Sequence, residues 1–108
     1  MMRSRFTEKA GNALNYALES ARSMGHTYIG SEHLLLGLLK EGSGVAYKTL
    51  ADLGVSAGEV EQIIVDSVGK GAPSTVTPTD MTPRTKRILE IALLEARNMG
   101  DSYIGTEH

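Results

Sequence analysis

The segment Arg22-Ser-Met-Gly-His-Thr-Tyr-Ile-Gly-Ser-Glu-His33 decides the fold, because it returns near the end of the chain as Arg97-Asn-Met-Gly-Asp-Ser-Tyr-Ile-Gly-Thr-Glu-His108. Extending the match outward overlays residues 6–33 on residues 81–108 without a gap, at a constant offset of 75 residues. Such self-similarity is typical of one structural unit used twice. We therefore expect two copies packed about a pseudo-two-fold axis, each presenting its own version of one surface loop.

The length and composition of the chain fit one helical domain with an aliphatic core. The 108 residues are 41% hydrophobic and 22% charged, and the aromatic residues are one phenylalanine and four tyrosines. The net charge of −2 argues against general nucleic-acid binding, which needs a basic face. Cysteine is absent, and no apolar run reaches the length of a membrane span. These features predict a cytoplasmic protein with neither a nucleic-acid nor a membrane partner.

Capping residues and apolar spacing predict five helices. Thr7, Ser31, Ser56 and Thr82 are the expected N-caps, with Ser56 in a capping box, and Thr106 is the equivalent cap in the second copy of the loop. The expected helices cover residues 8–24, 32–41, 45–53, 57–68 and 83–99.

The apolar residues of these helices predict what each buries. The first helix carries a stripe of alanines, which lets a neighbouring helix approach closely, and the leucine-rich second helix is expected to be the central buried element. Tyr28 and Ile29 are expected to anchor the loop between them. The residues expected to face inward in the last two helices are Val60, Ile63, Ile64, Val68, Ile88, Leu89, Ala92, Leu93, Ala96 and Met99.

The domain organisation follows from the repeat and from a change in composition. Residues 1–69 form a first four-helix repeat, and residues 70–81, rich in Gly, Ala, Pro, Ser and Thr, are a linker. Residues 82–108 are the beginning of a second repeat, which stops after its first helix and loop. By analogy with the first copy a leucine-rich helix should begin there, so we expect the chain to be a fragment.

Motifs for catalysis are missing from the sequence. No phosphate-binding loop occurs, and Gly69-Lys-Gly71 lies in the linker without the required spacing. The Glu-His pairs at 32–33 and 107–108 do not form a metal motif, because adjacent helical residues point about a hundred degrees apart. We expect a protein that is not an enzyme; a small hydrolase of unrecognised type is the alternative from another class.

Basic side chains gather at two helix starts, where the helix dipole makes them unfavourable. They are Arg3, Arg5 and Lys9 around Thr7, and Arg84, Lys86 and Arg87 around Thr82. Exposed helix-start amides with basic side chains suit an anion, and the carboxylate that opens the next helix, Glu32 or Glu107, suits a cation. A pocket of both signs would take a ligand with a guanidinium and a phosphate. The alternative is that these side chains are ordinary solvated surface.

The duplicated Met-Gly-x-x-Tyr-Ile-Gly-Ser/Thr-Glu-His motif, with Leu-Leu-Leu-Gly-Leu-Leu-Lys-Glu-Gly-Ser-Gly-Val-Ala after its first copy, resembles the amino-terminal Clp repeat domain of ClpC-type AAA+ unfoldases. The opening Arg5-Phe-Thr-Glu8 is also similar. The resemblance implies an all-α fold of two four-helix repeats and a non-catalytic domain that binds adaptor proteins and protein substrates. It would stand before ATPase rings, absent here, which would hold ATP and magnesium and feed a Clp peptidase. A stand-alone Clp-repeat accessory protein that docks on a Clp protease complex is the alternative.

The same resemblance implies a ligand and its residues. In ClpC proteins of Gram-positive bacteria this domain recognises arginine-phosphorylated substrates through the Glu of the Gly-Thr-Glu-His motif, a role that maps onto Glu32 and Glu107. Thr7 and Thr82 match the threonines that help hold phosphate, and Lys86 would contribute a positive charge. In the first copy Gly11 takes the place of Lys86. That site would therefore rely on Arg5 or Lys9.

Overall fold

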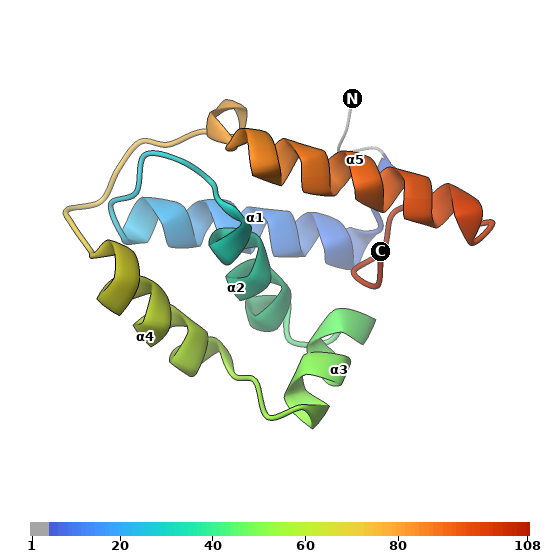
Figure 1. Ribbon diagram of the computed structural model, residues 1–108, viewed down its shortest axis with the longest axis horizontal. Coiled ribbons are helices and arrows are strands. Elements are labelled where there is room, and N and C mark those ends of the chain that lie inside the picture. Colours follow the sequence, from blue (N-terminus) through green and yellow to red (C-terminus); the bar gives the residue numbers. More distant parts are fainter. Residues whose placement is uncertain (1–4) are drawn as a thin grey trace.

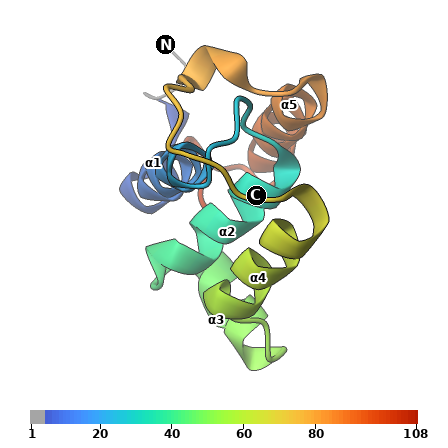
Figure 2. The ribbon, with the colours of Figure 1, turned by 90° about the vertical axis from the view of Figure 1, so that its left-hand side faces the viewer.

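The computed structural model describes residues 5–108, which fold into α-helices joined by loops (Figures 1 and 2). A one-turn 3-10 helix, η2 (Pro78–Asp80), lies in the predicted linker and was not expected. The five α-helices are α1 (Glu8–Ser23), α2 (Ser31–Glu41), α3 (Val45–Asp52), α4 (Ala57–Val68) and α5 (Pro83–Asn98). The predicted all-α class is confirmed, and every expected helix boundary lies within one residue of the observed one. No helix in the described residues is both long and apolar enough to cross a membrane.

The leucine-rich helix α2 lies at the centre, as predicted, and contacts α1, α3, α4 and α5. Its closest neighbour is α1, which crosses it at Gly37. A Cβ atom on Gly37 would collide with the carbonyl oxygen of Ala13 and lie 3.0 Å from the amide nitrogen of Ala17. The alanine stripe of α1 therefore gives the tight helix contact that its composition predicts, and Leu36 and Leu39 of α2 are buried beside it.

The predicted linker also contributes to the core. Val76 is buried in one cluster with Ala17, Ala21 and Ile29. The Arg22 side chain donates from Nε to the Val76 carbonyl over 2.7 Å, which fixes this segment along the end of α1. Residues 70–81 are thus a packed connection, although their composition is that of a flexible one.

Several residues predicted to face inward are exposed. In α4, Ile64 is buried and Val60 partly so, but Ile63 is 63% exposed and Val68 is also exposed, because α4 packs on α2 through one narrow stripe. In α5, Leu89, Ala92 and Ala96 are buried and Leu93 packs against them, as predicted. Ile88 and Met99, by contrast, are exposed.

A comparison of equivalent methionines explains the exposure on α5. Met24 is 2% exposed because it packs in a cluster with Leu36 of α2 and Ile64 of α4. Its counterpart Met99 is 60% exposed. Residues 5–108 contain no counterpart of α2 or α4 over α5, so the face that these helices cover in the first copy is open in the second.

The predicted threonine caps are confirmed, whereas the predicted serine cap of α2 is wrong. Thr7 accepts a hydrogen bond from the Ala10 amide (3.2 Å), and Thr82 accepts one from the Thr85 amide (3.1 Å). Ser56 likewise accepts one from the Glu59 amide over 3.3 Å.

At the start of α2, Ser31 is already the first helical residue and Gly30 is the N-cap. The Gly30 amide donates to Nδ1 of His33 over 2.8 Å, so the histidine three residues on accepts from the amide of the cap residue itself, as the glutamate of a capping box does. Thr106 is the predicted cap of the second copy. Its hydroxyl accepts a hydrogen bond from the Ala46 amide (3.3 Å) at the start of α3.

The two copies exchange equivalent backbone hydrogen bonds. The Thr7 amide donates to the Ile104 carbonyl over 2.9 Å, and the equivalent Thr82 amide donates to the Ile29 carbonyl over 3.1 Å. In return, the Ile104 amide donates to Arg5 (2.7 Å) and the Ile29 amide to Asp80 (3.0 Å). Each loop therefore pairs with the segment that precedes the first helix of the other copy, so the two loops form equivalent hydrogen bonds.

The isoleucines of the two loops are the anchors. Ile29 and Ile104 are both buried, as predicted for Ile29. Tyr28, which was expected to be buried with it, is only half-buried, and its counterpart Tyr103 is exposed. The backbone pairing fixes the isoleucine inward, so that the preceding tyrosine lies toward the surface.

Candidate functional site

The exchange of loops brings Thr7, Lys9 and Glu107 to one hollow, although Thr7 and Lys9 belong to the first copy and Glu107 to the second. Its volume is about 350 Å³. The walls come from the starts of α1 and α3 and from the second loop: Thr7, Glu8, Lys9, Ser43, Gly44, Val45, Lys48, Thr106 and Glu107. The sequence led us to combine helix start and glutamate within a copy, whereas the structure combines them between copies.

Lys48 is a basic residue of this hollow that sequence reasoning missed. It lies four residues after the Gly44 N-cap of α3, as Lys86 lies four residues after the Thr82 cap of α5. A basic side chain near a helix start was therefore a usable signal. The sequence alone does not reveal that the start of α3 faces the start of α1.

Glu41 sets part of the charge balance beside Lys9. It accepts hydrogen bonds from the Gly44 amide (2.6 Å) and from the amide and hydroxyl of Ser43. Burial acts to raise the pKa of the Glu41 carboxyl, but these hydrogen bonds and then the Lys9 charge outweigh it and lower the pKa below its ordinary value. The charge of Lys9 therefore also interacts with the Glu41 carboxylate. Lys48 is the second cation of the hollow.

The other predicted corner lies where the first loop meets the start of α5. The bond from the Thr82 amide to the Ile29 carbonyl holds Thr82 close to the loop that leads into Glu32. Glu32 is half-buried, and its carboxylate accepts a hydrogen bond from the Tyr28 hydroxyl over 3.3 Å. Burial raises the pKa of the Tyr28 hydroxyl, and the nearby Glu32 charge raises it further. Lys86 is exposed one turn after Thr82.

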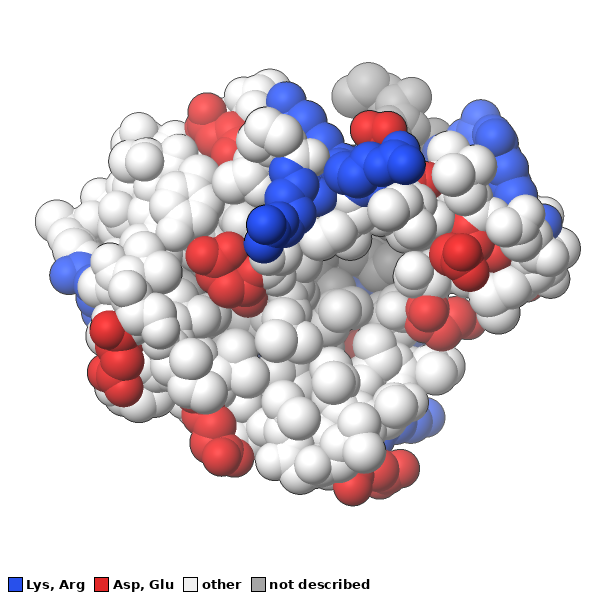
Figure 3. Space-filling model, viewed as in Figure 1, with Lys and Arg blue, Asp and Glu red and all other residues white. Residues whose placement is uncertain are grey.

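The remaining basic residues are less closely tied to the two corners. Figure 3 shows Lys and Arg side chains gathered over the first half of α5, with acidic side chains between them. Arg87 forms an exposed ion pair with Glu90 over 3.5 Å. Arg5 is exposed and does not line the hollow at Thr7, although its carbonyl accepts the Ile104 amide. Arg3 lies outside the described residues.

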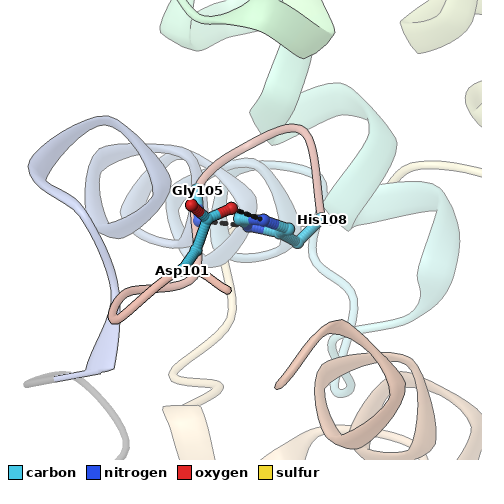
Figure 4. A network of polar contacts seen from close by, with 3 residues as sticks. All are labelled: Asp101, Gly105 and His108. Atoms are coloured by element: carbon cyan, nitrogen blue, oxygen red, sulfur yellow. Dashed lines mark hydrogen bonds and ion pairs between the residues drawn. The ribbon is translucent and has the colours of Figure 1, made fainter. Parts of the chain in front are cut away.

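The histidine after each glutamate is a capping group that fixes the turn before it. In the second copy, the Gly105 amide donates to Nδ1 of His108 and Nε2 of His108 bonds Asp101, each over 2.8 Å (Figure 4). Both ring nitrogens are therefore engaged. Among residues 5–108, no group of three or more His, Cys, Asp or Glu side chains is placed to hold a metal ion.

Comparison with known proteins gives relatives along the whole chain. The chain is 44% identical over 107 residues to the ATP-dependent Clp protease ATP-binding subunit ClpA homolog of Guillardia theta, covering 99% of this chain. It is also 44% identical over 108 residues to the negative regulator of genetic competence ClpC/MecB of Bacillus subtilis, covering all of this chain. The chain spans only 13% of the length of either relative.

Solved structures have the same fold. The N-terminal domain of the chaperone ClpD from Arabidopsis thaliana superposes with a TM-score of 0.78 at 27% identity, over 97% of this chain and 72% of that one. The N-terminal domain of the ClpV1 ATPase from E. coli, at 20% identity, has a TM-score of 0.75 over 95% of this chain and 63% of that one. Residues 5–108 match the model of the Clp repeat (R) N-terminal domain, and the chain therefore belongs to this family.

Proposed function

We propose that this chain is the substrate- and adaptor-binding N-terminal domain of a cytoplasmic ClpC-type unfoldase, and that its two mixed-charge corners bind phosphoarginine side chains of marked proteins. The observation that carries the proposal is the hollow lined by Thr7, Lys9, Lys48 and Glu107. It combines cationic side chains and a helix start with a carboxylate. The ATPase rings of such a protein would use ATP and magnesium and pass the bound substrate to a Clp peptidase.

In the first corner, which is the hollow at Thr7, each charge of phosphoarginine has a partner of opposite sign. The phosphoryl oxygens would face the start of α1 at Thr7 and the ammonium groups of Lys9 and Lys48, while the guanidinium would face the Glu107 carboxylate. Hydrogen bonds to charged groups contribute about 1.5–3 kcal/mol each. Arginine without the phosphoryl group would meet Glu107 but leave the lysines unpaired, and this difference is the basis of selectivity.

The second corner would use Glu32, Thr82 and Lys86 in the same way. Its cation comes from the first turn of α5, whereas the first corner, where Gly11 replaces Lys86, takes Lys9 from α1 and Lys48 from α3. The two corners would thus bind one chemical group through different lysines. The domain performs no reaction on its ligand and acts only by holding it.

Calorimetric titration of phosphoarginine into the purified chain tests this proposal. We expect binding at two sites, loss of one site in Glu107→Gln, loss of the other in Glu32→Gln, and loss of both in the double variant. Lys48→Met should weaken only the site that Glu107→Gln removes. Glu19→Gln, which changes an exposed glutamate on the outer part of α1, is the charge-matched control and should bind normally. Unchanged affinity in the double glutamate variant would contradict the proposal.

Free arginine and inorganic phosphate serve as control ligands. Free arginine lacks the phosphoryl group and inorganic phosphate lacks the guanidinium, so we expect both to bind at least about tenfold more weakly, given that 1.4 kcal/mol corresponds to a factor of ten. Equal affinity for inorganic phosphate would show a plain anion site and would remove the role assigned to the glutamates.

A further inference from the structure

Two histidines are buried against each other at the corner before α2. His33 is 0% exposed and His26 is 7% exposed. Nδ1 of His26 lies 2.7 Å from Nε2 of His33, with the ring planes tilted by 59°. Nδ1 of His33 accepts a hydrogen bond from the Gly30 amide, and Nε2 of His26 lies 2.8 Å from the Gly69 carbonyl oxygen. All four ring nitrogens therefore have a partner.

The partners fix where the protons are. The Gly30 amide can only donate, so Nδ1 of His33 accepts and the ring carries its proton on Nε2. That proton is donated to Nδ1 of His26, which leaves the proton of His26 on Nε2, where it meets the Gly69 carbonyl. The chain of bonds is complete when both rings are neutral. A further proton would place N–H against N–H, either between the rings or against the Gly30 amide.

These bonds join parts of the molecule that are far apart in sequence. His33 opens α2, while Gly69 is the C-cap of α4. The returning chain is attached at the same place, since the Gly71 amide donates to the Met24 carbonyl (2.8 Å) and the Ser74 hydroxyl donates to the His26 carbonyl (2.6 Å). The His26 ring is thus the side chain that links the end of α4 to the cap of α2.

The second copy has a different partner at the same position. Asp101 replaces His26 and accepts from Nε2 of His108 over 2.8 Å. The Asp101 carboxylate attracts the charge of a protonated imidazole, which the His26 ring does not. An added proton on Nδ1 of His108 would still meet the Gly105 amide, as in the first copy, so the two copies differ only in the partner of Nε2. The two copies therefore offer an internal comparison within one chain.

We propose that the His26–His33 pair is an acid-released latch, which holds the end of α4 and the following segment on the corner before α2 when neutral and lets them go when protonated. This latch does not depend on the proposed phosphoarginine sites. The groups that face it are Tyr28, whose ring stacks on His26 at 5.7 Å and meets His33 edge-on at 5.3 Å, and the Glu32 carboxylate. From the end of α4 the facing group is the Gly69 carbonyl.

The direction of the response follows from the surroundings of His33. Burial lowers the pKa of the His33 ring, Glu32 opposes this and His26 adds to it, and the pKa lies below the ordinary 6.5. Between that ordinary value and the lower folded value, the unfolded chain binds more protons than the folded one. The linked stability is therefore fully present above about pH 6.5 and is lost as the pH falls below it.

Proton positions and local opening can be measured together on the full 108-residue chain by NMR. Long-range 1H–15N spectra at pH 7.5 should show both His26 and His33 with the proton on Nε2. Between pH 7.5 and 5.5 the protection factors of the Gly30, Gly71 and Ser74 amides should fall, by up to about tenfold for each pH unit between the ordinary pKa of 6.5 and the lower pKa of His33. The protection factor of the Thr7 amide, which donates a hydrogen bond to the Ile104 carbonyl of the second loop, should stay constant.

His26→Gln separates titration from packing, because its amide retains one donor and one acceptor but does not take up a proton. We expect the pH dependence of the Gly71 and Ser74 protection factors to shrink by at least half in this variant. Constant protection of both amides in the wild-type chain across this range would overturn the proposal. So would an equal loss of protection at the Thr7 amide, which would indicate general acid unfolding.

Discussion

Gly37 sets the distance between the two central helices. Its missing Cβ lets α2 approach the Ala13 carbonyl and the Ala17 amide, which belong to the backbone of α1 and do not move aside as a flexible side chain does. A second glycine, Gly11, lies within α1 with nothing within 4 Å of an added Cβ. Gly37 and Gly11 are thus helical glycines with opposite surroundings.

We predict that Gly37→Ala destabilises the fold by about 1–3 kcal/mol, because the added methyl group forces the helices apart in a packed core. Gly11→Ala should stabilise it by about 0.5–1 kcal/mol, because alanine is the better helix former and meets no neighbour. Urea unfolding of both variants measures the difference. If Gly37→Ala were as stable as Gly11→Ala, close contact would not be the reason for glycine at this position.

Single residues also show where sequence reasoning succeeds and fails. Thr7 and Thr82 were correctly predicted as caps, because a cap depends on the amides of the next three residues. The predicted cap of α2 was wrong, because the helix begins one residue earlier with Gly30 as its cap, and only the backbone geometry decides which residue has the extended conformation of a cap. The roles of Glu32 and Glu107 in binding stay predictions.

At the scale of helices, local signals predicted where each helix begins and ends but not which residues it buries. Ile63 and Met99 carry the correct apolar spacing, yet both are exposed, because burial depends on a partner helix that spacing does not reveal. For the same reason the contribution of α3 to the hollow at Thr7 was missed. Lys48 reaches that hollow only because α3 lies across from the start of α1.

We predict that α3 is the least protected of the five helices. None of its residues is buried, and its main helix contact is with α2. One specific attachment is the bond from the Ala46 amide to the Thr106 hydroxyl. Hydrogen exchange followed by NMR should show α3 amides exchanging at least about tenfold faster than those of α2, because the free energy of local opening is lower where fewer contacts are buried.

Thr106→Val keeps the size of the side chain but removes the acceptor. It should speed exchange at Ala46 further while leaving the amides of α4 unchanged. Protection of α3 equal to that of α2 would show that this helix is held by more than its described contacts.

For the whole molecule, the repeat predicted a duplicated arrangement but not how the copies interlock. Each loop forms backbone hydrogen bonds with the segment that precedes the first helix of the other copy, so both corners contain residues from both copies. A substitution in one loop should therefore alter the structure at the helix start of the other copy. This coupling is a consequence of backbone pairing, which side-chain patterns do not encode.

The exposed apolar side chains of α5 lead to a prediction about association. Exposed apolar side chains on this helix include Ile88, Ile91, Leu94 and Met99, and exposed apolar side chains favour contact with another molecule. We predict that a polypeptide of these 108 residues self-associates as its concentration rises. Light scattering coupled to size-exclusion chromatography measures the change in mass.

Two leucine variants decide whether α5 is the associating face. Leu94 is 48% exposed, and its counterpart in the first copy is Glu19, so Leu94→Glu gives α5 the residue that α1 already tolerates. It should shift the molecule toward the monomer. Leu53, 74% exposed at the end of α3, is the control, and Leu53→Glu should leave association unchanged because it adds the same charge elsewhere. Equal effects of the two variants would mean that net charge controls association, and a monomeric wild-type chain at every concentration would refute the prediction.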